Sequence, residues 1–263
     1  MGTALALLYW LAALHSISFA CTPGGVSPVW SATGIGIAGL KLLGRRFWPA
    51  VALGSLGLNL SVHPSPVVVL WLTLASTIEA LLGASLVDWA TRRKALLMES
   101  RHAIGVVIAA VVAPLPCAAL GVTTLVAQGL IPSTAIWECF HTWWIADGVG
   151  TLIIVPGVVS LVWLVRSGAL PSVNTVLRSL VLTLLAGATV ALVFSNTLAP
   201  PFLYLLFPLL LLATVWFRHH GAHLLIGAVA IFMVWGWTWG RDVFNGDGDN
   251  AQLVHLQIFL CSL

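Results

Sequence analysis

Charged side chains are scarce in this sequence. Only 7% of its 263 residues are Asp, Glu, Lys or Arg, whereas 60% are hydrophobic and the mean hydropathy is +1.04. A soluble domain carries about 25% charged residues. So few charges cannot cover a surface that faces water, which excludes a soluble domain and argues against a nucleic-acid partner. The composition therefore predicts that the main partner is the lipid bilayer.

Cysteine is also rare, and the thiols are spread along the chain. No two of them form a CxxC pair, which would be typical of a thiolate metal site or a redox site. The sequence accordingly predicts neither a disulfide framework nor a metal site, and we expect no cofactor. The four residues are Cys21, Cys117, Cys139 and Cys261.

Catalytic motifs are missing as well. The sequence contains no HExxH pair, no Walker loop, no GxGxxG after a strand and no Ser–His–Asp order. Intramembrane catalysis has no support from these patterns, so we do not expect an enzyme.

Long apolar runs fill the space between the few charges. A helix needs about 20 apolar residues to cross a bilayer, and the first run lacks the basic start of a secretory signal. We therefore predict an all-α, polytopic integral membrane helix bundle of about 8–10 transmembrane helices. The candidate spans are residues 3–20, 29–43, 47–62, 67–89, 102–127, 143–165, 177–196, 200–217, 222–239 and a segment from 251 to the end, of which 29–43 and 47–62 are short.

Basic residues are distributed unevenly between the predicted loops. Lys and Arg are retained on the cytoplasmic side of a membrane. If all the segments cross and the N-terminus is cytoplasmic, only Arg241 of the eleven basic residues lies outside. This predicts that both ends are cytoplasmic, and it places His219 and His220 on an inner loop, where we expect them to be solvated. The inner basic residues are Lys41, Arg45, Arg46, Arg92, Arg93, Lys94, Arg101, Arg166, Arg178 and Arg218.

Two carboxylates, Glu79 and Asp147, fall inside predicted spans. An ionisable side chain at that depth is costly, so it usually faces a bundle interior or a cavity. One interpretation is structural: each carboxyl accepts hydrogen bonds from neighbouring helices and fixes their packing. The other is a polar pocket that binds a ligand or a partner helix.

Aromatic and polar side chains gather at the predicted outer ends of the spans. Trp30, Trp143 and Trp144 map there, and Glu138 and His141 join them. Indole rings commonly settle at a membrane interface without binding anything. That explanation weakens near the intramembrane carboxylates, because carboxyl and imidazole groups gain nothing from lipid. Aromatic walls with a few convergent polar groups are typical of a small-molecule site.

Small residues are spaced along the segment SATGIGIAGLKLLG, residues 31–44. Gly34, Gly36, Ala38 and Gly39 fall on neighbouring stripes of a helix. Small residues at such spacing let two helix backbones approach closely in lipid. The segment therefore predicts a compact helix bundle.

Four segments, taken in order, resemble the signatures of the MASE1 family (membrane-associated sensor 1). They are SPVWSATGIGIAGLKLLGRRFWPAVALGSLGLNL, STIEALLGASLVDW, WWIADGVGTLIIVPGVVSLVW and LVHLQIFL. One departure is Ser31, where the family usually has Pro after the Trp; it affects only the local start of that span. The residues at family positions are Trp30, Gly34, Gly44, Arg45, Trp48, Pro49, Gly54, Asn59, Glu79, Trp144, Asp147, Gly150, Pro156, Gln257 and Phe259.

The resemblance covers nearly the whole chain and implies one MASE1-like integral membrane sensor domain over residues 1–263. It implies the input module of a bacterial signalling protein in the inner membrane, with a homodimer formed through the full-length protein. Family members normally continue into a cytoplasmic output module such as a diguanylate cyclase or a histidine kinase. The segment from 251 reaches Leu263 before it is long enough to cross. We therefore expect its last helix to be truncated and the output domain to be absent.

The leading hypothesis is a sensor in which a ligand or partner engages an outer-half pocket and shifts the helices between two packings. One alternative is a secondary transporter or channel that uses the intramembrane carboxylates Glu79 and Asp147. Another is a bundle that senses a neighbouring membrane protein. The candidate ligand-binding residues are Trp30, Asn59, Glu79, Glu138, His141, Trp143, Trp144 and Asp147.

Overall fold

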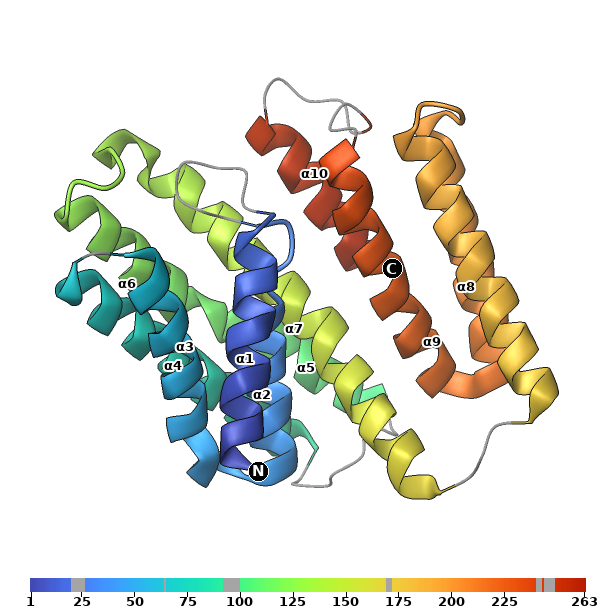
Figure 1. The fold of residues 1–263 in the computed structure, drawn as a ribbon, viewed down its shortest axis with the longest axis horizontal. Coiled ribbons are helices and arrows are strands. Elements are labelled where there is room, and N and C mark those ends of the chain that lie inside the picture. The colour runs from blue at the N-terminus through green and yellow to red at the C-terminus, as the bar shows by residue number, and fades with distance from the viewer. Residues whose placement is uncertain (20–26, 64, 92–99, 169–171, 240–242, 244–248) are drawn as a thin grey trace. The chain divides into compact units, whose positions relative to one another are not determined.

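The computed structural model describes residues 1–19, 27–63, 65–91, 100–168, 172–239, 243 and 249–263. Every regular element among these residues is a helix, which confirms the predicted fold class (Figure 1). The elements are α1 (Gly2–Ile17), α2 (Ser31–Leu43), η1 (Arg45–Phe47), α3 (Trp48–Val62), α4 (Pro66–Ala90), α5 (Ser100–Val112), α6 (Pro114–Ala127), η2 (Ser133–Ala135), α7 (Ile136–Ser167), α8 (Val173–Phe194), η3 (Pro200–Leu205), α9 (Leu206–Trp239) and α10 (Asp249–Ser262).

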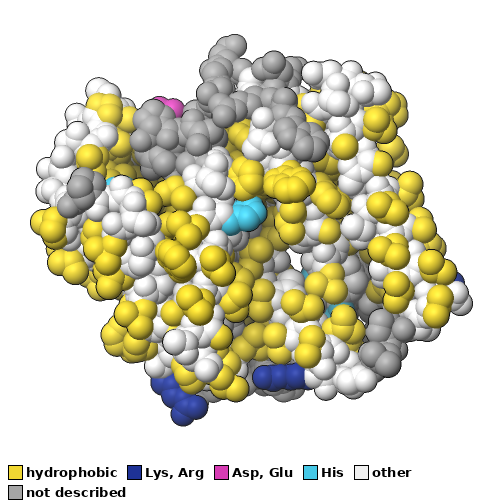
Figure 2. Space-filling model, in the orientation of Figure 1, with side chains coloured by type: hydrophobic (Ala, Val, Ile, Leu, Met, Phe, Trp, Pro, Cys, Tyr) yellow, Lys and Arg dark blue, Asp and Glu magenta, His cyan; other side chains and the backbone are white. Residues whose placement is uncertain are grey.

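Six of the described helical segments are long and apolar enough to cross a membrane. Hydrophobic side chains cover most of the helix flanks visible in Figure 2. The short segments behave differently: α2 has 13 residues and α3 has 15. At 1.5 Å per residue each is about 20 Å long, shorter than the hydrocarbon core of about 30 Å. The six long segments are Pro66–Ala90, Ala103–Ala127, Ser133–Ser167, Val173–Phe194, Pro200–Phe217 and His220–Thr238.

The chain divides into two compact units, Met1–Val155 and Pro156–Leu263, which we call unit 1 and unit 2. The boundary falls inside α7, and Pro156 is the first residue of unit 2. A proline inside a helix lacks the N–H that would bond to the preceding turn and weakens the helix there. The division of the chain therefore coincides with a weak point in the longest of the described segments that could span a membrane.

Close contacts between small residues hold unit 1 together. A Cβ on Gly54 of α3 would lie 2.7 Å from the Ala6 carbonyl oxygen of α1, so only glycine permits this approach. A Cβ on Gly34 of α2 would overlap the Gly150 carbonyl oxygen of α7. The compact packing predicted from the small-residue segment is confirmed. Around these contacts the core of the first four helices is built from Leu5, Tyr9, Ala13, Ala32, Leu40, Ala50, Val51, Leu58, Ala80 and Ala84.

The predicted span 102–127 consists of α5 and α6. Pro114 and Pro116 lie at the junction, and neither has a backbone N–H to donate to the preceding turn. The helix is therefore interrupted at Ala113 although the apolar run continues. This interruption places Cys117 in the first turn of α6, in the middle of the span.

A buried ion pair ties α2 to α4 in unit 1. The Lys41 ammonium lies 2.6 Å from the Asp88 carboxylate and donates to the Thr91 hydroxyl at 2.6 Å. The Lys41 side chain is 1% exposed and that of Asp88 is 20% exposed. Burial makes the pair necessary, because an unpaired charge in that position would be strongly destabilising.

In unit 2, α8 packs against α9 through glycine positions. A Cβ on Gly236 would lie 2.5 Å from the Phe194 ring, and one on Gly187 would lie 3.1 Å from the Phe232 ring. The predicted spans 200–217 and 222–239 correspond to η3 and α9, which is helical from Leu206 to Trp239. The structure therefore assigns helix where the sequence suggested a loop.

The expectation that His220 is solvated on a loop was wrong. Its ring stacks on Trp163 with centroids 4.1 Å apart, and its Nδ1 lies 3.1 Å from the Ser160 hydroxyl. His223 contacts the same hydroxyl at 3.0 Å. Stacking and hydrogen bonding keep this imidazole against the helices, which polarity alone does not predict.

The predicted orientation in the membrane stays a prediction. Several of the basic residues that define it, Arg92, Arg93, Lys94 and Arg241, lie outside the described residues, and so do the side chains of Arg101, Arg218 and His219. In keeping with the predicted orientation, we define the outer end of unit 1 as the end that carries the α3–α4 and α6–α7 connections.

Candidate functional site

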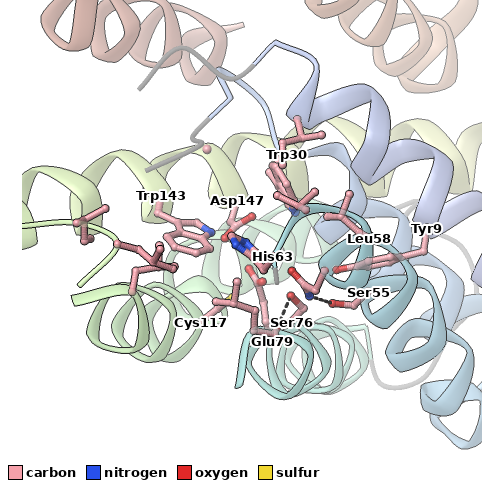
Figure 3. Close-up of a pocket in the computed structure, with 18 residues that line it drawn as sticks. Tyr9, Trp30, Ser55, Leu58, His63, Ser76, Glu79, Cys117, Trp143 and Asp147 are labelled. Carbon is pink, nitrogen blue, oxygen red and sulfur yellow. Dashed lines mark hydrogen bonds between the residues drawn. The ribbon is translucent and has the colours of Figure 1, made fainter. Parts of the chain in front are cut away.

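Unit 1 contains a cavity of about 300 Å³ (Figure 3). Its walls come from α1, α2's N-terminal flank, α3, α4, α6 and α7, so most helices of the unit contribute. Residues near the outer end, such as His63 and Ile131, line the same space as Glu79 at the middle of α4. The lining residues are Tyr9, Ile17, Trp30, Ser55, Leu58, Asn59, Val62, His63, Leu72, Ser76, Glu79, Cys117, Leu125, Leu130, Ile131, Trp143, Ala146 and Asp147.

Glu79 and Asp147 meet at this cavity through Thr33. The Thr33 hydroxyl lies 2.9 Å from Asp147 Oδ1 and 3.2 Å from Glu79 Oε2. Both carboxylates are 1% exposed and Thr33 is 2% exposed. One hydroxyl has one proton to donate, so it satisfies only one carboxylate at a time. The arrangement joins α2, α4 and α7 at a single point.

Glycines beside Asp147 allow α7 to come this close. A Cβ on Gly150 would overlap the Trp30 carbonyl oxygen, and one on Gly148 would lie 2.9 Å from the Ala110 carbonyl oxygen. The Trp30 N–H also donates to the Ala146 carbonyl at 3.1 Å. The backbone of α7 therefore touches the start of α2, and Asp147 is placed next to Thr33.

The short helix α2 begins deep inside the unit. Thr33 is only the third residue of α2, yet it contacts Glu79 at the middle of α4. The N-terminus of a helix carries a partial positive charge of about half an elementary charge. Both carboxylates therefore lie beside the first turn of α2, where this partial charge favours negative groups.

The second oxygen of each carboxylate has no hydrogen-bond partner. Glu79 Oε1 and Asp147 Oδ2 are buried and unpartnered, while their companion oxygens contact Thr33. Cys117 comes from a third helix, and one ligand atom from each of Glu79, Cys117 and Asp147 lies within 4.8 Å of the others. This is the one group among the described residues that could hold a metal ion, and Figure 3 shows its three side chains facing a common space.

Other polar groups form a separate wall of the cavity. Asn59 Nδ2 donates to the Ser55 hydroxyl at 3.2 Å and to the Thr73 hydroxyl at 3.3 Å. These contacts hold the Asn59 amide at the α3 side of the cavity.

His63 lines the cavity from the connection between α3 and α4. Partial burial lowers the pKa of His63 below its usual value of about 6.5. Its ring is therefore neutral at pH 7 and adds no positive charge beside the two carboxylates.

The structure brings together five of the eight predicted site residues: Trp30, Asn59, Glu79, Trp143 and Asp147 all line the cavity. The Trp143 ring fits over Gly121 of α6, where a Cβ would lie 2.7 Å from the indole. A ligand-binding role for these five residues stays a prediction.

The other three predicted residues are not part of this cavity lining. Trp144 donates its indole N–H to the Val111 carbonyl at 2.8 Å and thereby ties α7 to α5. Glu138 is exposed, and the exposed His141 stacks with Trp137 at 6.1 Å between ring centroids. Neighbours in sequence turn to different sides of a helix, which explains why residues close to Asp147 along the chain lie apart from the cavity lining. A ligand-binding role for these three residues stays a prediction.

Sequence reasoning missed Tyr9, Thr33, Ser76 and Cys117. Cys117 carried a signal, because it is a thiol in the middle of a span and follows two prolines that interrupt the helix. Thr33 lies within the small-residue segment, whose spacing indicates only close helix packing. Tyr9 and Ser76 are ordinary residues for an apolar helix, and nothing in their spacing indicates a cavity.

Comparisons with known proteins agree with this architecture. Searches of curated proteins and of solved structures give no match. The sequence model of MASE1 matches residues 1–263, the whole chain. MASE1 is a membrane sensory input domain of signalling proteins. The chain therefore belongs to the MASE1 family.

Proposed function

We propose that this domain detects a ligand in the cavity of unit 1 and transmits its presence as a shift in helix packing. The observation that carries the proposal is the cavity itself, about 300 Å³ in volume, whose lining includes two buried carboxylates and the indoles of Trp30 and Trp143. Small-molecule sites have volumes of about 300–1,000 Å³ and combine apolar walls with a few placed polar groups. This cavity matches that description at the lower limit of size.

The shared walls of the cavity explain how binding would change helix packing. Thr33, Glu79 and Asp147 come from three helices and already contact one another. A ligand that binds the two carboxylates acts on all three helices at this contact, and so favours one arrangement of α2, α4 and α7 over another. Only such differential affinity shifts an equilibrium, typically by about 1–3 kcal/mol.

Helix α7 connects the cavity of unit 1 directly to unit 2. It carries Asp147 in unit 1 and continues past Pro156 into unit 2. A movement of α7 at the cavity would therefore reach the rest of the domain without a separate mobile element. The proposed endpoint is a cytoplasmic output module in a bacterial inner-membrane protein that acts as a homodimer.

The test is a cavity-filling substitution with a control on the same helix. Ser76→Phe projects a ring into the cavity, whereas Leu74→Phe adds a similar ring at a position of α4 that is 45% exposed. Output is measured in cells, across growth conditions, for the signalling protein that contains this domain. Ser76→Phe is expected to fix output at one level, while Leu74→Phe keeps the range of the wild type.

A full output range in the Ser76→Phe protein would contradict the proposal. Adjacent buried carboxylates are also what a proton-coupled carrier would use. A proton flux into liposomes that disappears in Glu79→Gln would therefore favour transport. Loss of the output range only when a second membrane protein is deleted would favour partner sensing.

A further inference from the structure

We infer that Glu79, Cys117 and Asp147 form a binding site for one divalent metal ion of the zinc class, with a free coordination position facing the cavity. The inference rests on the proposed function and names the chemical class of the ligand. It departs from the expectation, drawn from the spacing of the cysteines, that the chain has no metal site. Three helices supply the three ligands: α4, α6 and α7.

Unpartnered oxygens indicate that something positive belongs at this position. No hydroxyl or N–H donates to Glu79 Oε1 or Asp147 Oδ2, which are buried, although the same two carboxylates share Thr33 through their other oxygens. The Cys117 thiol, a weak donor, lies against Glu79. A buried carboxylate is strongly unfavourable unless it takes up a proton, is paired or coordinates a metal. No Lys or Arg is among the described residues that line the cavity, and the buried Lys41 is paired with Asp88.

The distances suit a single small ion. The three ligand atoms lie within 4.8 Å of one another. Zinc bonds to oxygen and sulfur are about 2.0–2.3 Å long, which places the ligand atoms of a tetrahedral site about 3.5 Å apart. The largest separation of 4.8 Å exceeds this by about 1.3 Å, so a small side-chain adjustment would bring the three atoms to coordinating distances.

The donor atoms select the kind of ion. Calcium and magnesium prefer six or more oxygen ligands and gain little from a thiol. Zinc and cobalt accept thiolate and carboxylate ligands together. An organic ammonium ion would use the two carboxylates but would gain nothing from Cys117, so the thiol favours a metal. On binding, the Cys117 thiol forms a sulfur–metal bond and its proton leaves to solvent through the cavity.

Thr33 is a positioning residue for this site. Its hydroxyl contacts Asp147 Oδ1 and Glu79 Oε2, which leaves the opposite oxygens for the ion. Such outer contacts orient metal ligands and typically change affinity by about 10–100-fold when they are removed. The cavity beyond the ion has room for a water molecule or a solute donor as the fourth ligand.

The experiment measures metal binding by the purified full chain, stripped with a chelator and free of affinity-tag histidines. Zinc is titrated by calorimetry and counted by elemental analysis, and cobalt is used as a spectroscopic probe. We expect one zinc per chain and a thiolate-to-cobalt charge-transfer band. Cys117→Ser should abolish the band and weaken zinc binding at least about a hundredfold. The control Cys139→Ser, a buried cysteine outside the cluster, should leave both unchanged.

Thr33→Val separates a metal site from a carboxyl pair that only ties helices together. A metal site predicts that zinc affinity falls about 10–100-fold, while the cobalt band persists at saturating cobalt. Circular dichroism and size-exclusion profiles identify variants that fail to fold. Cys117→Ser, which changes one atom, decides the question if Asp147→Asn or Glu79→Gln does not fold.

Two results would overturn the inference: no stoichiometric zinc in the wild type, or binding that Cys117→Ser and Thr33→Val leave unchanged. Its failure is distinguishable from failure of the proposed function. If zinc does not bind but Ser76→Phe still fixes the output, only the metal assignment is lost. If zinc binds stoichiometrically and output does not respond to zinc or to Ser76→Phe, the metal site stands and the sensory role of the cavity fails.

Discussion

Units 1 and 2 place their polar side chains very differently. In unit 1, buried polar groups from several helices converge on one cavity. In unit 2, the buried Ser160 hydroxyl contacts two imidazoles, and the hydroxyl pairs Ser172–Thr175 and Ser195–Thr197 are exposed. The helices of the two units also differ in burial. In α4, 50% of the most apolar stretch is buried, whereas in α8 only 22% is buried. The comparison indicates that the polar groups of unit 1 are organised around the cavity, while the apolar flanks of α8 are available to lipid.

The two units also differ at individual glycines, and substitution of Gly150 in unit 1 should cause the largest loss of stability. A Cβ on Gly150 would overlap the Trp30 carbonyl oxygen, a backbone atom that cannot rotate away. Gly150→Ala should therefore separate α7 from α2 and destabilise unit 1 by at least about 3 kcal/mol, the upper range for overpacking. The measurements are the yield of monodisperse protein and the thermal unfolding midpoint.

Gly227 of α9 provides the matched control in unit 2. No atom lies within 4 Å of the Cβ that alanine would add there. Gly227→Ala should be neutral, or should stabilise the helix by up to about 1 kcal/mol because alanine is the better helix former. Equal unfolding midpoints of Gly150→Ala and Gly227→Ala would contradict the distinction between a glycine that permits a close helix contact and one that faces open space.

The buried ion pair of unit 1 gives the next largest effect. Lys41→Met removes the ammonium from Asp88 and Thr91 and leaves the carboxylate without its cation. Breaking a fully buried pair costs about 3–5 kcal/mol, and the 20% exposure of Asp88 reduces this to about 2 kcal/mol. Chemical unfolding in detergent measures the loss, and the double variant Lys41→Met with Asp88→Asn should recover part of it.

Unit 2 offers a cation in a different setting. The exposed Arg178 lies over the Trp216 ring at 5.2 Å from its centroid. Arg178→Met should therefore cost only about 0.5–1 kcal/mol, as is usual for an exposed cation–π contact. A cost as large as that of Lys41→Met would show that the contrast between the units does not extend to their charges.

Two neighbouring tryptophans of α7 test the contrast inside unit 1. Trp143 lines the cavity, whereas the Trp144 indole donates to the Val111 carbonyl at 2.8 Å. Trp144→Phe should lower stability by about 1 kcal/mol, the value of one hydrogen bond, without changing zinc affinity or the output range. Trp143→Leu should change the output range at similar stability. A changed output range in Trp144→Phe at unchanged stability would show that Trp144 takes part in ligand sensing.

The sequence was sufficient for the helical membrane fold, since that follows from composition and from the length of apolar runs. It also identified Glu79 and Asp147 as intramembrane carboxylates, because burying charge in lipid is costly wherever the helices lie. It could not reveal that Thr33 joins them or that Cys117 faces them. Those contacts depend on how three helices are rotated about their axes, and small-residue spacing does not determine that rotation.

Two differences between the expectations and the structure have physical causes of the same kind. Trp144 was grouped with Trp143 because the two are adjacent, but consecutive residues of a helix point about 100° apart. His220 was expected in water because it follows a basic residue, yet stacking on Trp163 and the contact with Ser160 hold it against the helices. Polarity predicts where a side chain is tolerated, whereas the partner that holds it comes from the packed structure.

The smallest expected effect concerns His63 and pH. Because burial lowers its pKa in the folded protein, His63 is more readily protonated in the unfolded chain. The resulting stabilisation is full above the unfolded pKa of about 6.5 and is lost as the pH falls through the lower folded value. His63→Gln removes this dependence, so the difference in unfolding midpoint between wild type and variant should narrow or reverse below about pH 6.5.

The difference measurement is needed because Glu79 and Asp147 line the same cavity and also titrate. Comparing two proteins that share those carboxylates leaves mainly the contribution of the imidazole. Zinc affinity at about pH 7.5, above the ordinary histidine pKa, should be equal in the two, since His63 lies outside the group formed by Glu79, Cys117 and Asp147. A marked loss of zinc affinity in His63→Gln would make the imidazole the fourth metal ligand and would extend the site to the α3–α4 connection.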